Sequence, residues 1–161
     1  MAKKEEKTNV MRVLEQKQIP YTAHTYPADG PTDGVSVANY LHQDVEQVFK
    51  TLVTKAASGI YYVFDIPVAE NLDLKKAAKA VGEKSIAMIP QKELLPLTGY
   101  VHGGCSPVGM KKQFHTVFHE TVILFDTICV SAGKIGAQVE VAPDALSALL
   151  GADTADVVVE A

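Results

Sequence analysis

The chain has 161 residues, 47% hydrophobic and 21% charged, which is typical of one globular domain able to bury about 70% of its unfolded surface. No apolar run approaches the ~20 residues of a membrane helix, and the start, MAKKEEK, has no apolar segment behind it, so we expect neither a membrane partner nor a secretory signal. Two cysteines are too few for a disulfide framework, and we expect a single domain over residues 1–161 in the cytoplasm.

The first part of the chain mixes helix and strand signals. Two strands joined by the Ser58-Gly59 turn form a predicted hairpin. In order, the pattern predicts a helix from Thr8 to about Gln18, a strand over Tyr21–Tyr26, a loop over Pro27–Gly34, a helix over Val37–His42 capped by Ser36, another helix capped by Asp44, and strands over Phe49–Ala56 and Ile60–Ile66.

The second part continues in the same way. Hairpins outnumber β-α-β crossovers, so we predict a mixed α/β (α+β-like) domain with a largely antiparallel or mixed sheet flanked by helices. The predicted elements are a helix from Leu72 to Val81 stopped by Gly82, a strand over Ser85–Ile89, a short helix or turn over Gln91–Leu97, strands over His115–Phe118, Thr127–Ser131 and Gln138–Val141, a helix over Pro143–Leu150, and an edge strand over Asp156–Glu160.

The stretch from Gly99 to Lys112, GYVHGGCSPVGMKK, departs from these periodic patterns. The pair Gly103-Gly104 lets the backbone take positive φ and lets another molecule approach closely, while Pro107 stiffens the loop after the glycines. Such a loop exposes backbone N–H and C=O groups and suits a ligand rich in hydroxyls or carbonyls. An ordinary connection between strands is the simpler interpretation of a Gly-Gly pair.

Charge is unevenly distributed along the chain. The net charge is −4, but residues 135–161 hold five acids and no Lys or Arg, whereas residues 71–134 hold eight lysines against five acids. A local basic face is therefore compatible with the acidic total. Because Arg12 is the single arginine, bidentate reading of bases is nearly ruled out, and DNA is not an expected partner.

Several kinds of catalytic site find no support in the sequence. The spacing of Gly103, Gly104 and Gly109 matches no nucleotide-binding fingerprint. His115 and His119 lie on a predicted strand about 13 Å apart, so one metal ion could not reach both, and we expect no metal. Cys105 follows the glycine pair and could be a nucleophile, but a half-buried cysteine is the simpler interpretation.

Lys50 opens an apolar strand directly after Val48 and Phe49. A partly buried lysine there requires an anionic or hydroxyl-rich partner. The alternative is that its stem covers apolar surface while the ammonium reaches water. Tyr26, at the end of its strand, could line a pocket or cap the core.

These features together resemble the YbaK/EbsC family of aminoacyl-tRNA editing domains, relatives of the insertion domain of bacterial prolyl-tRNA synthetase, and within it the Cys-tRNA(Pro) deacylase group. The joint presence of F-K-T-L and of G-x-x-x-P, from Gly103 to Pro107, is the specific part of the resemblance. The similar segments are Lys7–Tyr21, His24–Tyr26, Val48–Val53, Asn71–Gly82, Thr98–Lys112 and Val130–Pro143.

The resemblance implies a curved mixed sheet and hydrolysis of the ester that joins a mischarged amino acid to tRNA(Pro), without a cofactor. It implies that Lys50 positions the 3′-terminal adenosine, that Gly103 contacts the aminoacyl group with its backbone, and that Tyr26, Thr51 and Ser131 line the pocket. Gly104 is a second candidate donor, and Pro107, which completes the motif, is also expected to be part of the substrate-binding site. The substrate's own thiol is implied as the nucleophile, lysines as contacts to the acceptor stem (Lys75, Lys76, Lys79, Lys111, Lys112), and prolyl-tRNA synthetase as a partner.

Two departures from the family pattern remain. The second glycine turn reads Ser131-Ala132-Gly133 instead of Ser-Gly-Gly, which would strain the turn if Ala132 needed positive φ. Cys105 occupies a position that the family does not reserve for cysteine. Two alternatives stay open: a deacylase for Ala-tRNA(Pro) or another small residue, and a non-catalytic module that binds tRNA or a synthetase.

Overall fold

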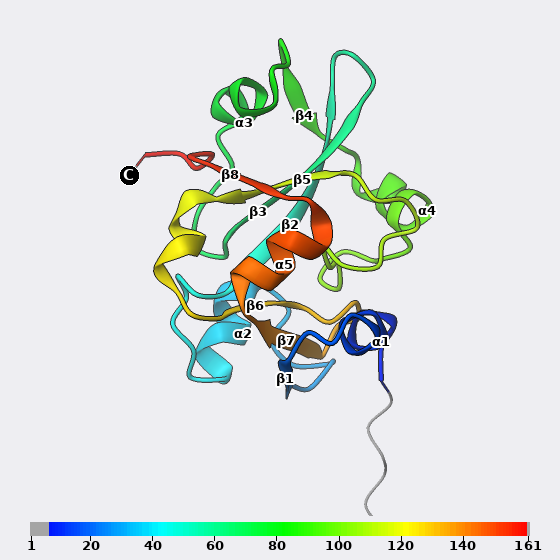
Figure 1. Cartoon of the computed structure of the whole chain (residues 1–161), viewed down its shortest axis with the longest axis vertical. Helices are drawn as coiled ribbons and strands as arrows, with labels where there is room; N and C mark the ends of the chain where they lie inside the picture. Colours follow the sequence, from blue (N-terminus) through cyan, green and yellow to red (C-terminus); the bar gives the residue numbers. More distant parts are fainter. Residues whose placement is uncertain (1–6, 161) are drawn as a thin grey trace, which may run out of the picture.

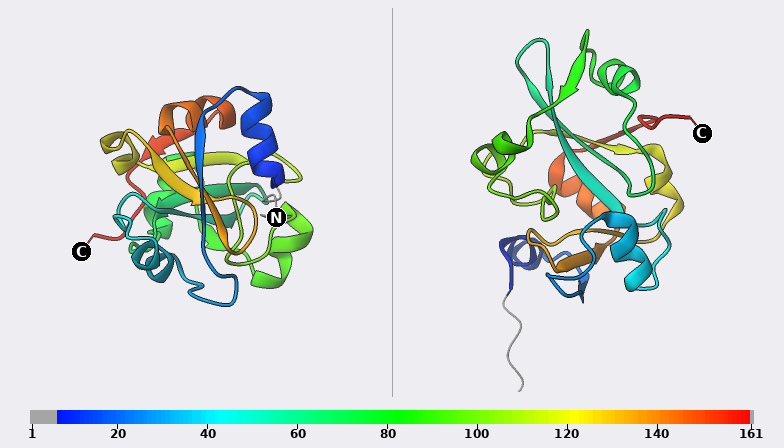
Figure 2. Two further views of the ribbon diagram at one scale, coloured as in Figure 1. Left: turned by 90° about the horizontal axis from the view of Figure 1, so that it is seen from below. Right: turned by 180° about the vertical axis from the view of Figure 1, so that it is seen from behind.

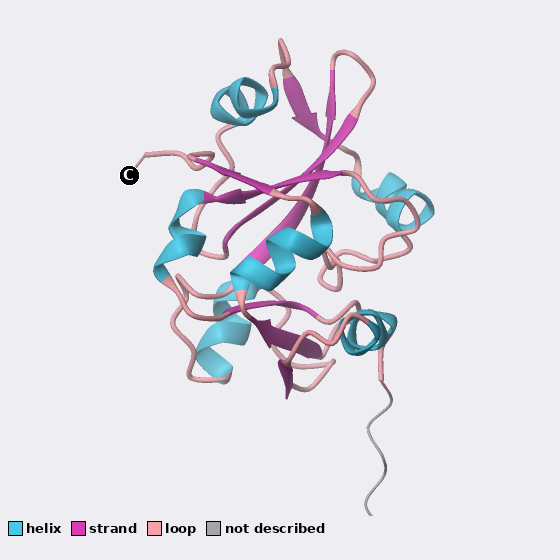
Figure 3. Ribbon diagram, in the orientation of Figure 1, coloured by secondary structure: helices cyan, strands magenta, loops and turns pink. Residues whose placement is uncertain are grey.

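A computed structural model describes residues 7–160. Most of the charged start, on which the expectation of no secretory signal rests, lies outside these residues. No helix within the described range is long and apolar enough to span a bilayer. The elements, shown in Figures 1 and 3, are α1 (Asn9–Gln16), β1 (Tyr21–Thr25), α2 (Gly34–Tyr40), β2 (Phe49–Ala56), β3 (Tyr61–Pro67), α3 (Leu74–Val81), β4 (Ile86–Met88), η1 (Gln91–Glu93), α4 (Leu94–Thr98), β5 (His115–His119), η2 (Glu120–Leu124), β6 (Ile128–Ser131), β7 (Ala137–Val141), α5 (Pro143–Leu150) and β8 (Asp153–Ala155).

The predicted mixed α/β fold is confirmed, with its strands divided between two sheets. The larger has the order β4-β2-β3-β5-β8, antiparallel except for the two parallel pairs made by β5, and contains the predicted β2–β3 hairpin. The smaller is antiparallel, in the order β1-β7-β6. An isolated parallel bridge between Val48 and Cys129 joins the sheets where β2 begins. The head of β2 therefore lies at this junction (Figure 2), and Lys50 is the second residue of that strand.

The helices begin close to their predicted positions, with one exception. Thr8 caps α1 as expected, by accepting from the Met11 N–H. The cap of α2 is Asp33 and not Ser36, because the Asp33 carboxylate accepts both the backbone N–H and the hydroxyl of Ser36. The helix predicted after Asp44 is wrong: the segment closes a single turn, from Gln47 N–H to the Asp44 carbonyl, before β2.

The C-terminal edge strand also differs from the prediction. β8 precedes the predicted Asp156–Glu160 and pairs parallel with β5. The predicted segment is irregular, because its backbone serves other partners: the Val157 N–H donates to His119 Nδ1, and Val158 makes an isolated bridge with Leu72. The three consecutive valines, Val157 to Val159, favour a strand, but among the described residues the segment forms one isolated bridge and no extended ladder.

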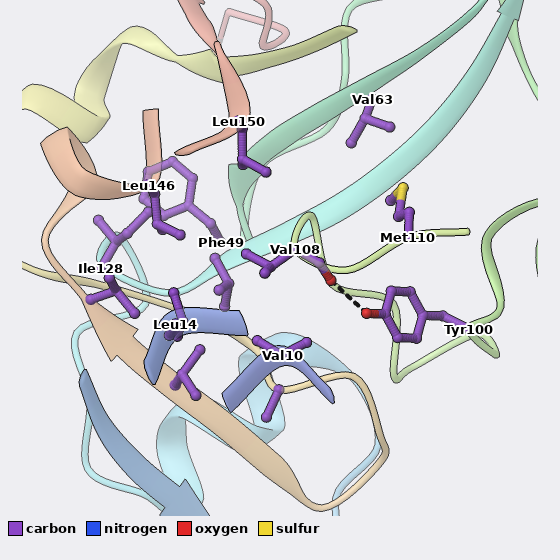
Figure 4. Close-up of a cluster of buried hydrophobic side chains, with 14 of the residues drawn as sticks. Val10, Leu14, Phe49, Val63, Tyr100, Val108, Met110, Ile128, Leu146 and Leu150 are labelled. Carbon is purple, nitrogen blue, oxygen red and sulfur yellow. Dashed lines mark hydrogen bonds between the residues drawn. The ribbon is translucent and has the colours of Figure 1, made fainter. Parts of the chain in front are cut away.

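The main core lies between the two sheets, where α1 and α5 pack (Figure 4). Leu146 of α5 and Leu14 of α1 are fully buried, and Phe49 of β2 joins the same cluster. A second cluster packs α3 against the opposite face of the larger sheet. A third, small cluster joins α2 to the start of β2 and to Cys129. The head of β2 is thereby fixed on two sides by packed helices.

Candidate functional site

A pocket of about 350 Å³ opens where the two sheets meet. Five of the seven site residues expected from the sequence line it, among them both Lys50 and Gly103. It is bounded by the end of β1, the start of α2, the head of β2, the glycine loop and the start of the β6–β7 turn. The lining residues are Tyr26, Thr32, Asp33, Gly34, Val35, Val37, Val48, Phe49, Lys50, Thr51, Leu52, Val68, Leu94, His102, Gly103, Cys105, Val130, Ser131 and Gln138.

Lys50 is half-buried at the pocket wall. Burial lowers the pKa of its ammonium from the usual value, and the charge of Glu70 opposes that effect. Among residues 7–160, no carboxylate lies within 4.0 Å of its Nζ. Desolvated in this way and without a close counter-ion, Lys50 is suited to bind an anionic or hydroxyl-rich group that enters the pocket.

The two glycines of the central loop differ in their surroundings. Gly103 is exposed, lines the pocket and has φ of 87°, a conformation that disfavours any side chain. Gly104 is buried outside the pocket, where a Cβ would meet the backbone of Lys134 and Ile135 at 3.0 Å. Its N–H already donates to the Val101 carbonyl, at 3.0 Å. Gly104 therefore allows the two glycine turns to pack closely, and its N–H is not the free donor that we expected.

The rest of the loop is fixed from beneath. Pro107 is buried and does not line the pocket, so it shapes the loop from behind. Ser106 is also fully buried and accepts the Val108 N–H, which removes it as a nucleophile. The Tyr100 hydroxyl donates to the Val108 carbonyl, as the dashed line in Figure 4 shows. This bond ties the loop to the core.

The second glycine turn accommodates Ala132 without strain. Gly133 and Gly136 have φ of 95° and 98°, whereas Ala132 is not among the described residues with positive φ. The turn is closed by the Ala132 N–H, which donates to the Ala137 carbonyl, and by the Gly133 N–H, which donates to Ser131 Oγ. Ser131 lines the pocket, and within residues 7–160 its hydroxyl accepts a hydrogen bond but donates none, so the alanine at position 132 leaves the placement of Ser131 intact.

Tyr26, which directly follows β1, and Thr51 of β2 both line the pocket. The Tyr26 N–H donates to the Gly136 carbonyl, at 2.9 Å, and thereby holds the end of β1 against the second glycine turn. Thr51 Oγ1 donates to Oδ1 of Asp65, at 2.5 Å, and Asp65 is fully buried on β3. Asp65 was not among the site residues expected from the sequence. Its charge within the apolar run YYVFDIP was the feature that could have marked it as a candidate.

Both cysteines are poor nucleophiles in this structure. Burial raises the pKa of the Cys105 thiol to about 12, with a further rise from the charge of Asp65, although Cys105 lines the pocket. Burial also raises the pKa of Cys129 to about 12. Because the thiolate is the reactive form, neither side chain is activated for attack.

The histidines fall into separate environments. His115 pairs with Asp153 at 2.6 Å, and the buried His119 accepts the Val157 N–H, so the two do not converge. A different trio does: single ligand atoms of His24, Cys129 and Glu140 lie within 4.8 Å of one another on one face of the smaller sheet. This trio could hold a divalent cation, but His24 Nε2 and Glu140 Oε1 already bind each other at 2.8 Å.

The lysines expected at the acceptor stem do not gather at the pocket. Lys76 bridges Asp156 and the Val158 carbonyl, each at 2.9 Å, and is committed to the C-terminal segment. Its neighbours on α3, Lys75 and Lys79, are exposed, but Figure 1 shows α3 and the pocket helix α2 at opposite ends of the molecule. Lys111 donates to the Pro96 carbonyl at 3.4 Å.

Comparison with known proteins agrees with this geometry. Over 160 residues, 98% of each chain, the sequence is 43% identical to EbsC of Enterococcus faecalis, which is named provisionally as a Cys-tRNA(Pro)/Cys-tRNA(Cys) deacylase. A crystal structure assigned provisionally as a trans-editing enzyme for prolyl tRNA synthetase is 26% identical, with a TM-score of 0.82 over 94% of this chain and 95% of that one. A hypothetical protein that is 21% identical shares the fold, with a TM-score of 0.85 over 93% of this chain and 99% of that one. Residues 32–149 match the model of the aminoacyl-tRNA editing domain, and the chain belongs to that family.

Proposed function

We propose that this protein is a free-standing editing enzyme that hydrolyses the ester of mischarged Cys-tRNA(Pro). The observation that carries the proposal is the shared pocket, in which a desolvated lysine, Lys50, and an exposed backbone bend at Gly103 lie together. The resemblance of the chain to a named Cys-tRNA(Pro)/Cys-tRNA(Cys) deacylase supports the choice of substrate. The whole chain, residues 1–161, acts as one editing domain in the cytoplasm.

Each of the seven site residues expected from the sequence has a role in this proposal. Lys50 binds the 3′-terminal adenosine end of the tRNA, and the backbone of Gly103 contacts the aminoacyl group. Tyr26, Thr51 and Ser131 form the walls around that group. Gly104 and Pro107 act indirectly, since they hold the loop that presents Gly103. Prolyl-tRNA synthetase is the proposed partner that supplies selectivity for tRNA(Pro).

The chemistry is assigned to the substrate. The cysteinyl sulfur attacks its own ester carbonyl carbon, a carbon–sulfur bond forms, the bond from that carbon to the ribose 3′-oxygen breaks, and the leaving oxygen takes up the thiol proton. The products are free tRNA and a cyclic thioester of cysteine. Water then opens the cyclic thioester, which restores the thiol and completes the net hydrolysis to cysteine. The high pKa values of Cys105 and Cys129 support a mechanism without an enzyme thiol. Orientation of the reacting atoms then supplies most of the acceleration, up to about 7–11 kcal/mol. The Gly103 N–H is the candidate donor to the developing oxyanion.

A deacylation assay tests the proposal. The wild-type protein is expected to release cysteine from tRNA(Pro) faster than alanine or serine from the same tRNA. Lys50→Ala is expected to lower kcat/KM by roughly 100-fold or more, because the ester loses its orientation. Lys55→Ala, at an exposed lysine on the same strand, is the matched control, and Cys105→Ala is expected to stay active.

Each alternative outcome has a definite meaning. Preferential release of alanine or serine would move the substrate to another mischarged tRNA(Pro). Loss of activity in Cys105→Ala with the fold intact would assign the attack to the enzyme's own thiol. Tight binding of tRNA without release of any amino acid at stoichiometric protein would favour a non-catalytic binding module.

A further inference from the structure

A buried carboxyl group lies behind the wall of the pocket. Asp65 on β3 is directly opposite Thr51 on β2, and its side chain is fully buried. Its Oδ1 accepts the Thr51 hydroxyl, whereas Oδ2 has no hydrogen-bond partner within residues 7–160. No lysine, arginine or histidine of that range forms an ion pair with it. Asp65 is therefore a buried acid left partly unsatisfied.

Two residues of the pocket lining, Thr51 and Cys105, are neighbours of Asp65. Thr51 binds it directly, and Cys105 lies close enough for the charge of Asp65 to raise the pKa of the Cys105 thiol. Buried polar atoms in folded proteins nearly always have a partner, and exceptions concentrate at functional sites. Burial opposes ionisation of Asp65, but a cation that enters beside Thr51 favours the charged form, and in this low-dielectric position that charge attracts the cation.

The hydroxyl of Thr51 determines which kind of group it can bind. A threonine hydroxyl has one proton, and here that proton is donated to Asp65. Toward the pocket Thr51 can then offer only lone pairs, so its ligand must be a hydrogen-bond donor. Carbonyl and phosphate oxygens are excluded at this position, whereas an ammonium group supplies both the donor and the charge that Asp65 favours.

We infer that Thr51 and Asp65 form a subsite for the α-ammonium group of the aminoacyl ester. Thr51 is the contact residue, and Asp65 is a positioning residue that fixes the Thr51 proton and supplies the charge. The inference rests on the proposed function and adds to it a reason why the pocket would prefer aminoacyl esters over esters of neutral acids. Lys50 then holds the adenosine end while this subsite holds the amino end.

Binding of stable analogues tests the subsite without requiring hydrolysis. The probes are the alanyl and lactyl amides of 3′-amino-3′-deoxyadenosine, which differ only in an ammonium or a hydroxyl group at the α-carbon. By isothermal titration, the wild-type protein is expected to bind the alanyl amide roughly tenfold more tightly or better, as for a hydrogen bond to a charged group. Asp65→Asn, which keeps an acceptor for Thr51, is expected to lower that ratio to less than threefold.

Two further variants keep the test decisive. Thr51→Val should lower the same ratio if Asp65→Asn fails to fold. Asp33→Asn removes a carboxylate that lines the pocket directly and caps α2, and this variant should keep the wild-type preference. Equal binding of the two amides by the wild type, or an unchanged preference in Asp65→Asn, would overturn the subsite. Preference for the alanyl amide without release of any amino acid from tRNA would instead keep the subsite and refute the proposed hydrolysis.

Discussion

Replacement of Asp65 by asparagine should change the pH dependence of stability in a defined direction. Burial raises the pKa of Asp65 to about 7, from the value near 3.9 that an unfolded chain gives it. Between these pH values the native state binds a proton that the unfolded state has lost. The stability that protonated Asp65 allows is therefore fully present below about pH 4 and is lost as pH rises through 7.

The size of the effect depends on the span of pH. Each pH unit over which only the native state holds the proton changes the free energy of unfolding by about 1.36 kcal/mol. Two such units lie between pH 5 and pH 7, so the wild-type protein should lose about 3 kcal/mol from this group by pH 8. Asparagine has nearly the same shape and no charge to bury, so the variant should not lose this contribution.

Urea unfolding of both proteins at pH 5 and pH 8 measures the difference. The free energy of unfolding of Asp65→Asn minus that of the wild type should be about 3 kcal/mol larger at pH 8 than at pH 5, so the variant gains relative stability as pH rises. Taking the difference between two proteins cancels every other group that titrates in both. Asp126→Asn, at an exposed carboxyl, controls for removal of a carboxyl as such. A relative stability that is equal at both pH values would refute the burial argument.

Two other predictions concern the glycine loop and helix α2. Tyr100→Phe removes the donor to the buried Val108 carbonyl and should cost about 1–3 kcal/mol in urea unfolding, with faster amide exchange in the glycine loop; wild-type stability would contradict it. Gly34→Ala places a Cβ 2.3 Å from Val68 Cγ1, so it should lower stability by about 1–3 kcal/mol and weaken binding of the alanyl amide; an unchanged thermal midpoint would show that α2 can shift freely.

Features that depend on residues close together in the chain could be predicted from the sequence. The Ser58-Gly59 turn between two apolar runs predicts the β2–β3 hairpin, because a hairpin needs only adjacent strands and a tight turn. The contrast between Gly103, which lines the pocket, and Gly104, which is buried, needed the structure. It depends on the second glycine turn at Lys134, about thirty residues away, which packs against Gly104.

Long-range partners account for the features that the sequence could not predict. Thr51 and Asp65 meet only because β2 and β3 pair in one particular register. The trio of His24, Cys129 and Glu140 comes from three strands of one sheet, and His24 is 116 residues from Glu140. The prediction of a strand over Asp156–Glu160 was wrong for the same reason. Strand formation depends on pairing with a distant segment, and here that pairing is one isolated bridge between Val158 and Leu72.

The two experiments on Asp65 together separate a structural role from a functional one. A carboxyl retained only for stability would lower both stability and binding when it is replaced. Here asparagine is expected to raise stability at pH 8, relative to its effect at pH 5, and to lower the preference for an ammonium ligand. A substitution that raises stability but lowers ligand preference indicates a group whose charge is unfavourable in the free protein and is stabilised by the bound ligand. The structural reason to expect these two effects is Oδ2 of Asp65, which lies beside Thr51 and has no hydrogen-bond partner within residues 7–160.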